Sequence, residues 1–196
     1  MKKVERNELL GLGEYEQIRS QFRARVIAEK KDRRVLVSDE ISVVFENHDT
    51  ALFQIQEMLR TERITKEAAI LHELETYNEL VPGDAELSAT MFVEIADAAT
   101  RERRLLELAG LEGTIALEVL GTRIAARNET RGVLPDRTTA VHYIKFPLGQ
   151  ELATRLVARG KEADGAMFFL LEHPKLSLRK EIPAVTVRNL ADDLRG

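Results

Sequence analysis

The sequence contains no cysteine among its 196 residues. This excludes disulfide bonds, thiol redox chemistry, and iron–sulfur or zinc–thiolate ligation by this chain alone. The chain also lacks an excess of basic residues, because 29 Lys and Arg stand against 33 Asp and Glu, for a net charge of −4. A general nucleic-acid-binding protein normally carries a basic excess, so we expect no nucleic-acid partner.

Long apolar runs are missing too. None approaches the roughly 18 residues that a membrane-spanning helix needs, and the longest, residues 166–171, has the length of a strand. The opening residues MKKVERNELLGLGEYE carry two lysines without an apolar segment after them, so they do not resemble a signal peptide. We therefore expect a cytoplasmic protein without a membrane partner, and the lack of cysteine fits that compartment.

The common catalytic motifs are absent. The glycines of Gly11-Leu12-Gly13 follow no predicted strand and are not followed by the third glycine of a dinucleotide fingerprint. His72-Glu73 begins like a helical zinc-protease motif, but Thr76 stands where the second histidine belongs. No GxxxxGK[ST] phosphate loop and no GxSxG elbow occur. The sequence therefore assigns no reaction, and it leaves open whether the protein is an enzyme.

The chain does contain a clear pattern of hairpins and amphipathic helices. Apolar residues at helical spacing predict an N-terminal helix over residues 14–32. Because most predicted strands follow one another as hairpins, we predict a single α+β domain over residues 1–196, with a mainly antiparallel sheet and helices packed on one face. Residues 128–137, which are polar and contain Gly132 and Pro135, are predicted to form a mobile loop. The strands are predicted at 35–37, 41–45, 87–95, 114–120, 122–126, 139–147, 166–171 and 177–182.

The most informative stretch is residues 45–63, FENHDTALFQIQEMLRTER. It predicts a strand end, a helix cap and a helix with an unusual density of dissimilar polar side chains. Carboxylates and an imidazole at such a junction suit a hard or borderline metal, and two arginines suit a carboxylate or phosphate. The alternative is a helix cap with an intrahelical Glu57–Arg60 pair and solvated ions. The candidate ligand-binding residues here are Glu46, Asn47, Asp49, Gln56, Glu57, Arg60 and Arg63.

Two further groups extend the candidate site. Glu73 and Tyr77 stand four residues apart on a predicted helix that ends near Asn78. A half-buried Glu73 at that position would have a raised pKa, because burial disfavours the charged carboxylate, and such a group is suited to act as a general base. The alternative is a tyrosine hydroxyl satisfied by a polar neighbour. His142 alternates with apolar residues, which is more typical of a hydrogen-bonded core histidine than of a ligand. Glu57 and Glu73 are the weak catalytic candidates, and Tyr77, Asn78 and His142 are candidate ligand-binding residues.

Several segments together resemble a known family. The segments are FENHDTALFQIQEMLRTERI (45–64), ELETYNELVP (73–82), TTAVHYIKFPL (138–148), EHP (172–174) and an opening helix that ends in RARVIAEKKDRRV. They are similar to a family of uncharacterised bacterial proteins, a domain of unknown function. His48 departs from the family pattern, which favours the neighbouring Glu46, Asn47 and Asp49 as ligands. The resemblance implies a gene neighbourhood with rubrerythrin-like and iron–sulfur proteins, and hence an accessory role in iron or peroxide metabolism and oxidative stress.

The leading hypothesis is a cytoplasmic accessory protein that binds a small ligand, anion or metal at the strand–helix junction. Arg60 and Arg63 would clamp its charge, and Glu57 would orient them or act as a ligand. The alternative is a non-catalytic interaction module that docks a non-haem iron redox partner such as a rubrerythrin-like protein. The sequence names no cofactor. A homodimer is the default assembly for a symmetric oligomer, but no residue demands one.

Overall fold

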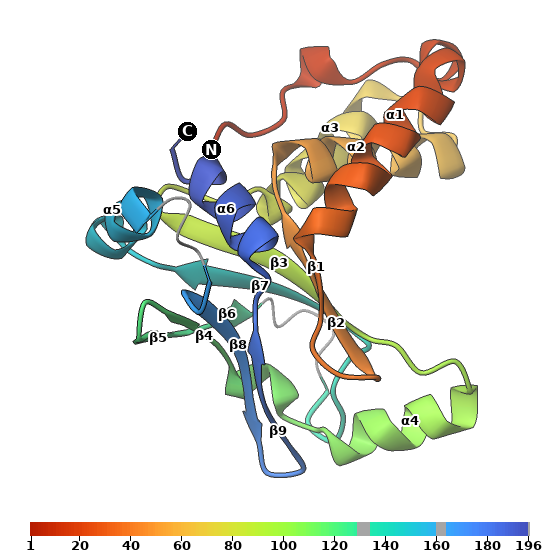
Figure 1. Cartoon of the computed structure of the whole chain (residues 1–196). Helices are drawn as coiled ribbons and strands as arrows, with labels where there is room; N and C mark the ends of the chain where they lie inside the picture. The colour runs from red at the N-terminus through yellow and green to blue at the C-terminus, as the bar shows by residue number, and fades with distance from the viewer. Residues whose placement is uncertain (129–133, 160–163, 196) are drawn as a thin grey trace.

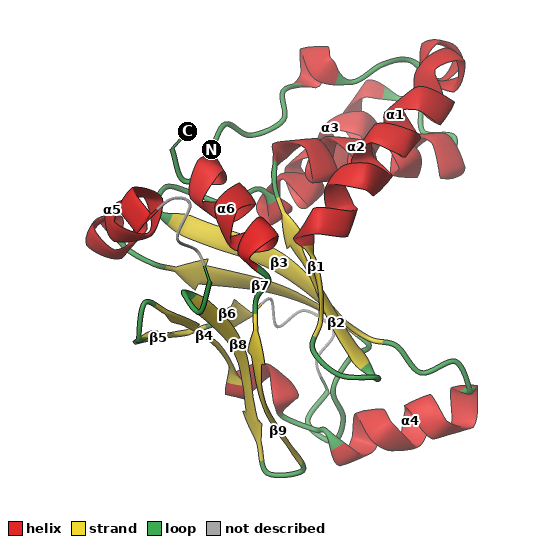
Figure 2. Cartoon of the chain, viewed as in Figure 1, coloured by secondary structure: helices red, strands yellow, loops and turns green. Residues whose placement is uncertain are grey.

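The structure, a computed structural model, describes residues 1–128, 134–159 and 164–195 (Figures 1 and 2). Its helices and strands alternate irregularly along the chain, as the pattern of hairpins predicts. The α-helices are α1 (Leu12–Arg33), α2 (His48–Thr61), α3 (Glu67–Tyr77), α4 (Ala98–Glu107), α5 (Gln150–Arg159) and α6 (Ala184–Asp193). The short 3₁₀ helices are η1 (Arg6–Glu8), η2 (Asn78–Leu80) and η3 (Leu111–Thr114).

The strands form two sheets, and every pairing in them is antiparallel. The predicted α+β class with antiparallel pairing is therefore confirmed, although the strands divide between two sheets. The first sheet has the order β1 (Arg34–Leu36), β2 (Ile41–Glu46), β3 (Glu86–Val93), β7 (Val141–Pro147) and β6 (Arg127–Asn128). The second has the order β5 (Thr122–Ala125), β4 (Ile115–Val119), β8 (Met167–His173) and β9 (Leu176–Glu181).

One extended segment passes directly from the second sheet to the first. The segment predicted as a single strand over 122–126 forms β5 in the second sheet and then continues as β6 in the first. Ala126 lies at the crossing, where its N–H donates to the carbonyl of Ile115 at 2.9 Å. Of the predicted mobile loop at 128–137, Asn128 belongs to β6, and residues 129–133 lie outside the described residues.

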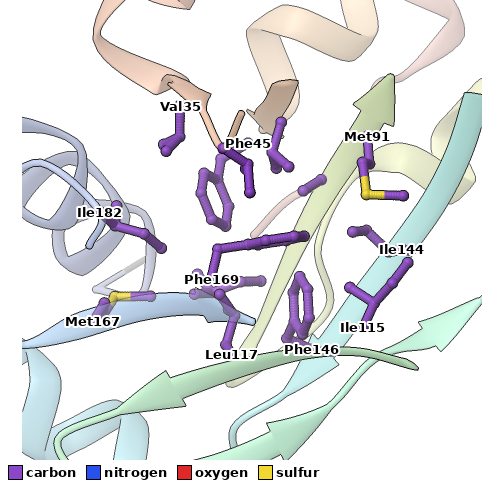
Figure 3. Packing of buried hydrophobic residues seen from close by; sticks show 14 of the residues in the cluster. Val35, Phe45, Met91, Ile115, Leu117, Ile144, Phe146, Met167, Phe169 and Ile182 are labelled. Carbon is purple, nitrogen blue, oxygen red and sulfur yellow. The ribbon is translucent and has the colours of Figure 1, made fainter. Parts of the chain in front are cut away.

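The main core lies between the sheets (Figure 3). Odd-numbered residues of β2 and β3 and even-numbered residues of β7 face the second sheet, because side chains of a strand alternate between its two faces. The rings of Phe146 and Phe169 meet edge to face with their centroids 6.3 Å apart, and Phe45 lies beside Phe169 (Figure 3). Helices α5 and α6 add buried residues such as Leu156 and Leu190 to the same cluster.

A second, smaller core lies within the helical layer. Ala51, Ile55 and Leu59 form the inner stripe of α2, and they pack against residues of α3 and of the N-terminal segment such as Ile70 and Val4. Helices α1, α2 and α3 lie together on one side of the first sheet (Figures 1 and 2). Consequently one face of this sheet packs on the second sheet, and its opposite face meets the helices.

Candidate functional site

Glu57 is bound by α1. Its carboxylate accepts hydrogen bonds from the hydroxyl of Tyr15 at 2.8 Å and from two nitrogens of Arg19, each at 2.8 Å. The hydrogen bonds from Arg19 lower the pKa of Glu57, against the opposing effect of its partial burial. Tyr15 is fully buried, and burial together with the Glu57 carboxylate raises the pKa of its hydroxyl. The geometry therefore makes Glu57 an ionised acceptor that fastens α1 to α2.

Of the other charged candidates at α2, Arg60 and Asp49 also form ion pairs within the protein. Arg60 forms an ion pair with Glu16 of α1 at 2.5 Å. Arg63 follows the end of α2 with a positive φ of 53°, and its side chain is exposed and pairs with no carboxylate of the described residues. Asp49 accepts from His48 at 3.0 Å and pairs with Arg25 at 3.2 Å.

Two amide candidates bind backbone instead. The side chain of Gln56 accepts from the N–H of Leu10 and donates to its carbonyl, both at 3.0 Å. Asn78 does the same to Val4, at 2.8 and 2.9 Å. Each side-chain amide therefore accepts one hydrogen bond from the backbone of a single residue in the N-terminal segment and donates one to it. In this way both side chains hold that segment against the helices.

Asn47 caps α2. Its side-chain oxygen accepts from the N–H of Thr50 at 2.9 Å, and the Thr50 hydroxyl accepts from the N–H of Asn47 in return. The Asn47 amide also donates to Glu29 of α1 at 2.5 Å. This reciprocal cap satisfies backbone donors that a helix start leaves free, as the sequence predicts for the cap.

His142 lies on the opposite face of the first sheet, apart from the α2 residues. It is 4% exposed, and its Nε2 lies 3.2 Å from the hydroxyl of Thr138, which donates to Glu112 at 3.1 Å. Burial lowers the pKa of His142, and the nearby Glu112 opposes that effect. The sequence candidates therefore fall into separate groups, with α2 side chains facing α1, amides holding the N-terminal segment, and His142 beside η3.

The helix-facing side of the first sheet carries a row of four polar residues. Glu46 of β2 stands opposite Ser88 of β3, Ser88 opposite Lys145 of β7, and Lys145 opposite Arg127 of β6. Because paired residues point to the same face, these four side chains cross the sheet in one line. We call them the polar row. It has a carboxylate at one end and two cations at the other.

A second line of residues lies beside the polar row. Thr90 stands opposite Tyr143, and its hydroxyl donates to Glu46 at 2.7 Å. Burial raises the pKa of Tyr143, and the Glu46 carboxylate adds to this effect. Tyr77 of α3 has a pKa raised by burial, then by Tyr143 and Glu73, while its hydrogen bond with Gln54 opposes these effects. Tyr77 and Tyr143 thus lie close enough to influence each other across the space between helix and sheet.

A pocket of about 490 Å³ opens at this place. We call it the α3 pocket. Thr76, Tyr77, Glu79 and Leu80 form its helical wall, and Ser88, Tyr143, Lys145 and Arg127 form its sheet wall, with Asn128 and Ile144 at the same edge. Three members of the polar row therefore line one cavity, together with two tyrosines. Of the sequence candidates, Tyr77 lines this cavity, and Glu46 stands directly beside it in the sheet register.

Of the two cations that line the α3 pocket, one has a carboxylate partner among the described residues and the other has none. Lys145 lies 3.2 Å from Glu86 and is half-buried. Arg127 is exposed at the rim, and no carboxylate of the described segments pairs with it. Glu79 has an interaction partner of its own. Arg127 therefore offers its planar set of donors to the pocket, a geometry that suits a carboxylate or a phosphate.

Within residues 1–128, 134–159 and 164–195, no three His, Asp or Glu side chains gather in a group that could hold a metal ion. None of the helices in these segments combines the length and apolarity that crossing a bilayer requires.

These features define an α+β protein whose first sheet packs on a second sheet through one face and forms a polar pocket with α3 through the other. The chain belongs to the family described as "Protein of unknown function (DUF3501)", whose model matches residues 3–194. This confirms the resemblance to a family of unknown function. The chain is also similar to a crystal structure of a novel protein of unknown function from Burkholderia pseudomallei K96243. That similarity has 32% identity and a TM-score of 0.89, and covers 98% of this chain and 100% of the other. Among curated proteins, no match was found.

Proposed function

We propose that this protein binds a small anionic molecule in the α3 pocket. The observation that carries the proposal is Arg127, a guanidinium at the rim without a carboxylate partner among the described residues. Lys145 adds a second cation next to it in the register. A guanidinium binds a carboxylate or phosphate through two parallel hydrogen bonds, which gives both affinity and orientation.

The size and lining of the pocket support a small organic ligand. Its volume of about 490 Å³ lies within the usual range for small-molecule sites, roughly 300–1,000 Å³. Tyr77 and Tyr143 supply aromatic surface with polar tips, and Leu80 adds apolar surface. An anion with a planar or apolar body fits these walls better than a bare inorganic ion.

The junction after Glu46 supports an anion site less well. Glu57 is engaged by Tyr15 and Arg19, and Arg60 by Glu16, so a ligand there would have to displace contacts between α1 and α2. The link to iron or peroxide metabolism and the docking of a rubrerythrin-like partner stay predictions from the family resemblance. The α3 pocket depends on neither.

The test compares charged and neutral probes of one shape. We expect benzoate to raise the thermal unfolding midpoint of the wild-type protein, because a ligand that binds only the folded state stabilises it, and benzyl alcohol to leave it unchanged. Arg127→Gln should abolish the benzoate effect. Arg123→Gln is the matched control, since Arg123 pairs with Glu172 on the second sheet. The proposal is refuted if benzoate raises the unfolding midpoint of Arg127→Gln as much as that of the wild type. It is also refuted if neither benzoate nor inorganic phosphate raises the midpoint of the wild type.

A further inference from the structure

The polar row separates opposite charges across one sheet face. Adjacent strands lie about 4.8 Å apart, so the backbones at Glu46 and Lys145 are roughly 10 Å apart with Ser88 between them. Arg127 stands one strand further away from Glu46. Glu46 and Lys145 are therefore too widely spaced for a simple cross-strand ion pair. Lys145 is paired instead with Glu86.

Glu46 carries an unsatisfied oxygen. The residue is 2% exposed, and its Oε1 accepts a hydrogen bond from Thr90 at 2.7 Å. Its Oε2 is buried and has no hydrogen-bond partner among the described residues. A buried carboxylate oxygen without a donor is costly, so native proteins normally give it a partner. In the sheet register Glu46 stands next to Ser88, which lines the α3 pocket.

We infer that the ligand of the α3 pocket is amphoteric, with a hydrogen-bond-donating ammonium or amine at one end and an anionic group at the other. The donor end lies against Ser88, one strand away from Glu46, whose carboxylate attracts it. The anionic end lies against Lys145 and Arg127. The body between the two ends contacts Tyr77 and Tyr143. This inference rests on the proposed function and narrows it from an anion to a small molecule with both charges, such as an amino acid.

Other parts of the molecule carry a weaker case. The groove between α1 and α2 is lined by apolar residues such as Leu10 and Phe22 together with Glu8 and Arg25, and no described segment indicates what would cover it. The His142–Thr138–Glu112 cluster is closed by its own hydrogen bonds. Within the part of the chain that the structure describes, only the polar row combines a cavity, the unpaired cation Arg127 and a buried acceptor without a donor.

The experiment uses probe pairs that differ by one ammonium group. Binding of 4-(aminomethyl)benzoate is compared with 4-methylbenzoate, and 6-aminohexanoate with hexanoate, by isothermal titration calorimetry on the full-length protein. We expect the ammonium to improve affinity roughly tenfold in at least one pair, since hydrogen bonds to charged groups are the stronger ones. Glu46→Gln should remove the gain while retaining the binding of the simple carboxylate. Glu118→Gln is the matched control, because it removes a carboxylate from the second sheet, where Glu118 pairs with Arg179. This variant should keep the gain in affinity.

The outcomes separate the two proposals. If the simple carboxylates bind through Arg127 but the ammonium adds nothing, or if the gain survives in Glu46→Gln, the amphoteric ligand is refuted and the anion site stands. If neither member of either pair binds, both proposals fail together. Circular dichroism of Glu46→Gln verifies its fold. Should this variant unfold, Thr90→Val gives the second measurement. It removes the donor to Oε1 and leaves the charge in place, so the ammonium gain must persist.

Discussion

Replacing Glu57 by alanine should destabilise the fold far more than replacing its neighbour Arg60. Glu57 is the acceptor for the hydroxyl of Tyr15, whose side chain is fully buried between α1 and α2. Without Glu57 that hydroxyl stays buried, and the described residues give it no other hydrogen-bond acceptor. Arg60, in contrast, pairs with Glu16 where both side chains are partly exposed, at 34% and 52%.

The magnitudes follow from these two environments. A buried hydroxyl left without a partner costs about 1–3 kcal/mol. An exposed ion pair contributes less than about 1 kcal/mol. Glu57→Ala should therefore lower the free energy of unfolding by about 1–3 kcal/mol, and Arg60→Ala should change it by a fraction of that amount. In a Tyr15→Phe background no hydroxyl is left unpaired, so there Glu57→Ala should cost markedly less.

Urea unfolding followed by circular dichroism measures all four variants at pH 7. The reasoning is refuted if Glu57→Ala costs the same with Tyr15 and with Phe at that position, or if Arg60→Ala is as harmful as Glu57→Ala. The pH dependence gives a second check. The pKa of Glu57 is lowered in the folded state, mainly by hydrogen bonds from Arg19, so its stabilising effect is present above the unfolded pKa of about 4.3 and is lost as the pH falls through the folded value. The difference between wild type and Glu57→Ala should therefore shrink below about pH 4.

Two further predictions concern buried groups. Burial lowers the pKa of His142 against the opposing effect of Glu112, so the folded state binds the proton more weakly. Stability should therefore decrease as the pH falls below the unfolded value of about 6.5, and His142→Gln should flatten this part of the pH profile in thermal unfolding. Arg33 is 5% exposed and donates to both oxygens of Asp193, at 2.6 and 2.8 Å. Arg33→Met should cost about 3–5 kcal/mol by leaving Asp193 unpaired, and Arg33→Met with Asp193→Leu should recover most of that loss in urea unfolding.

Local patterns in the sequence predicted most elements of the fold because they depend on near neighbours. Alternation over residues 87–95 predicts the strand that is β3, and helical spacing over 14–32 predicts α1, which extends over Leu12–Arg33. The division into two sheets was not predictable in this way. It depends on the crossing at Ala126, where one continuous extended segment changes partners from β4 to β7, and no residue in that segment marks the change.

The α3 pocket escaped sequence reasoning for a related physical reason. Density of polar side chains singled out α2, yet a polar side chain at a helix–helix contact can be fully satisfied there, as Gln56 and Glu57 are. Ser88 and Lys145 look ordinary within their own strands and become neighbours only through a pairing of residues 57 positions apart.

One signal was nevertheless present in the sequence. The strand that ends in Glu46 and the strand around Ser88 carry small or charged residues on the face away from the main core, interrupted by Val44 and Phe92. A sheet face that is polar and yet covered by helices needs partners for its polar groups. Thr90 supplies one to Glu46, and the remaining acceptor borders the pocket wall at Ser88. A polar strand face beneath a helical layer therefore points to the proposed site in this fold, and the density of charges on α2 does not.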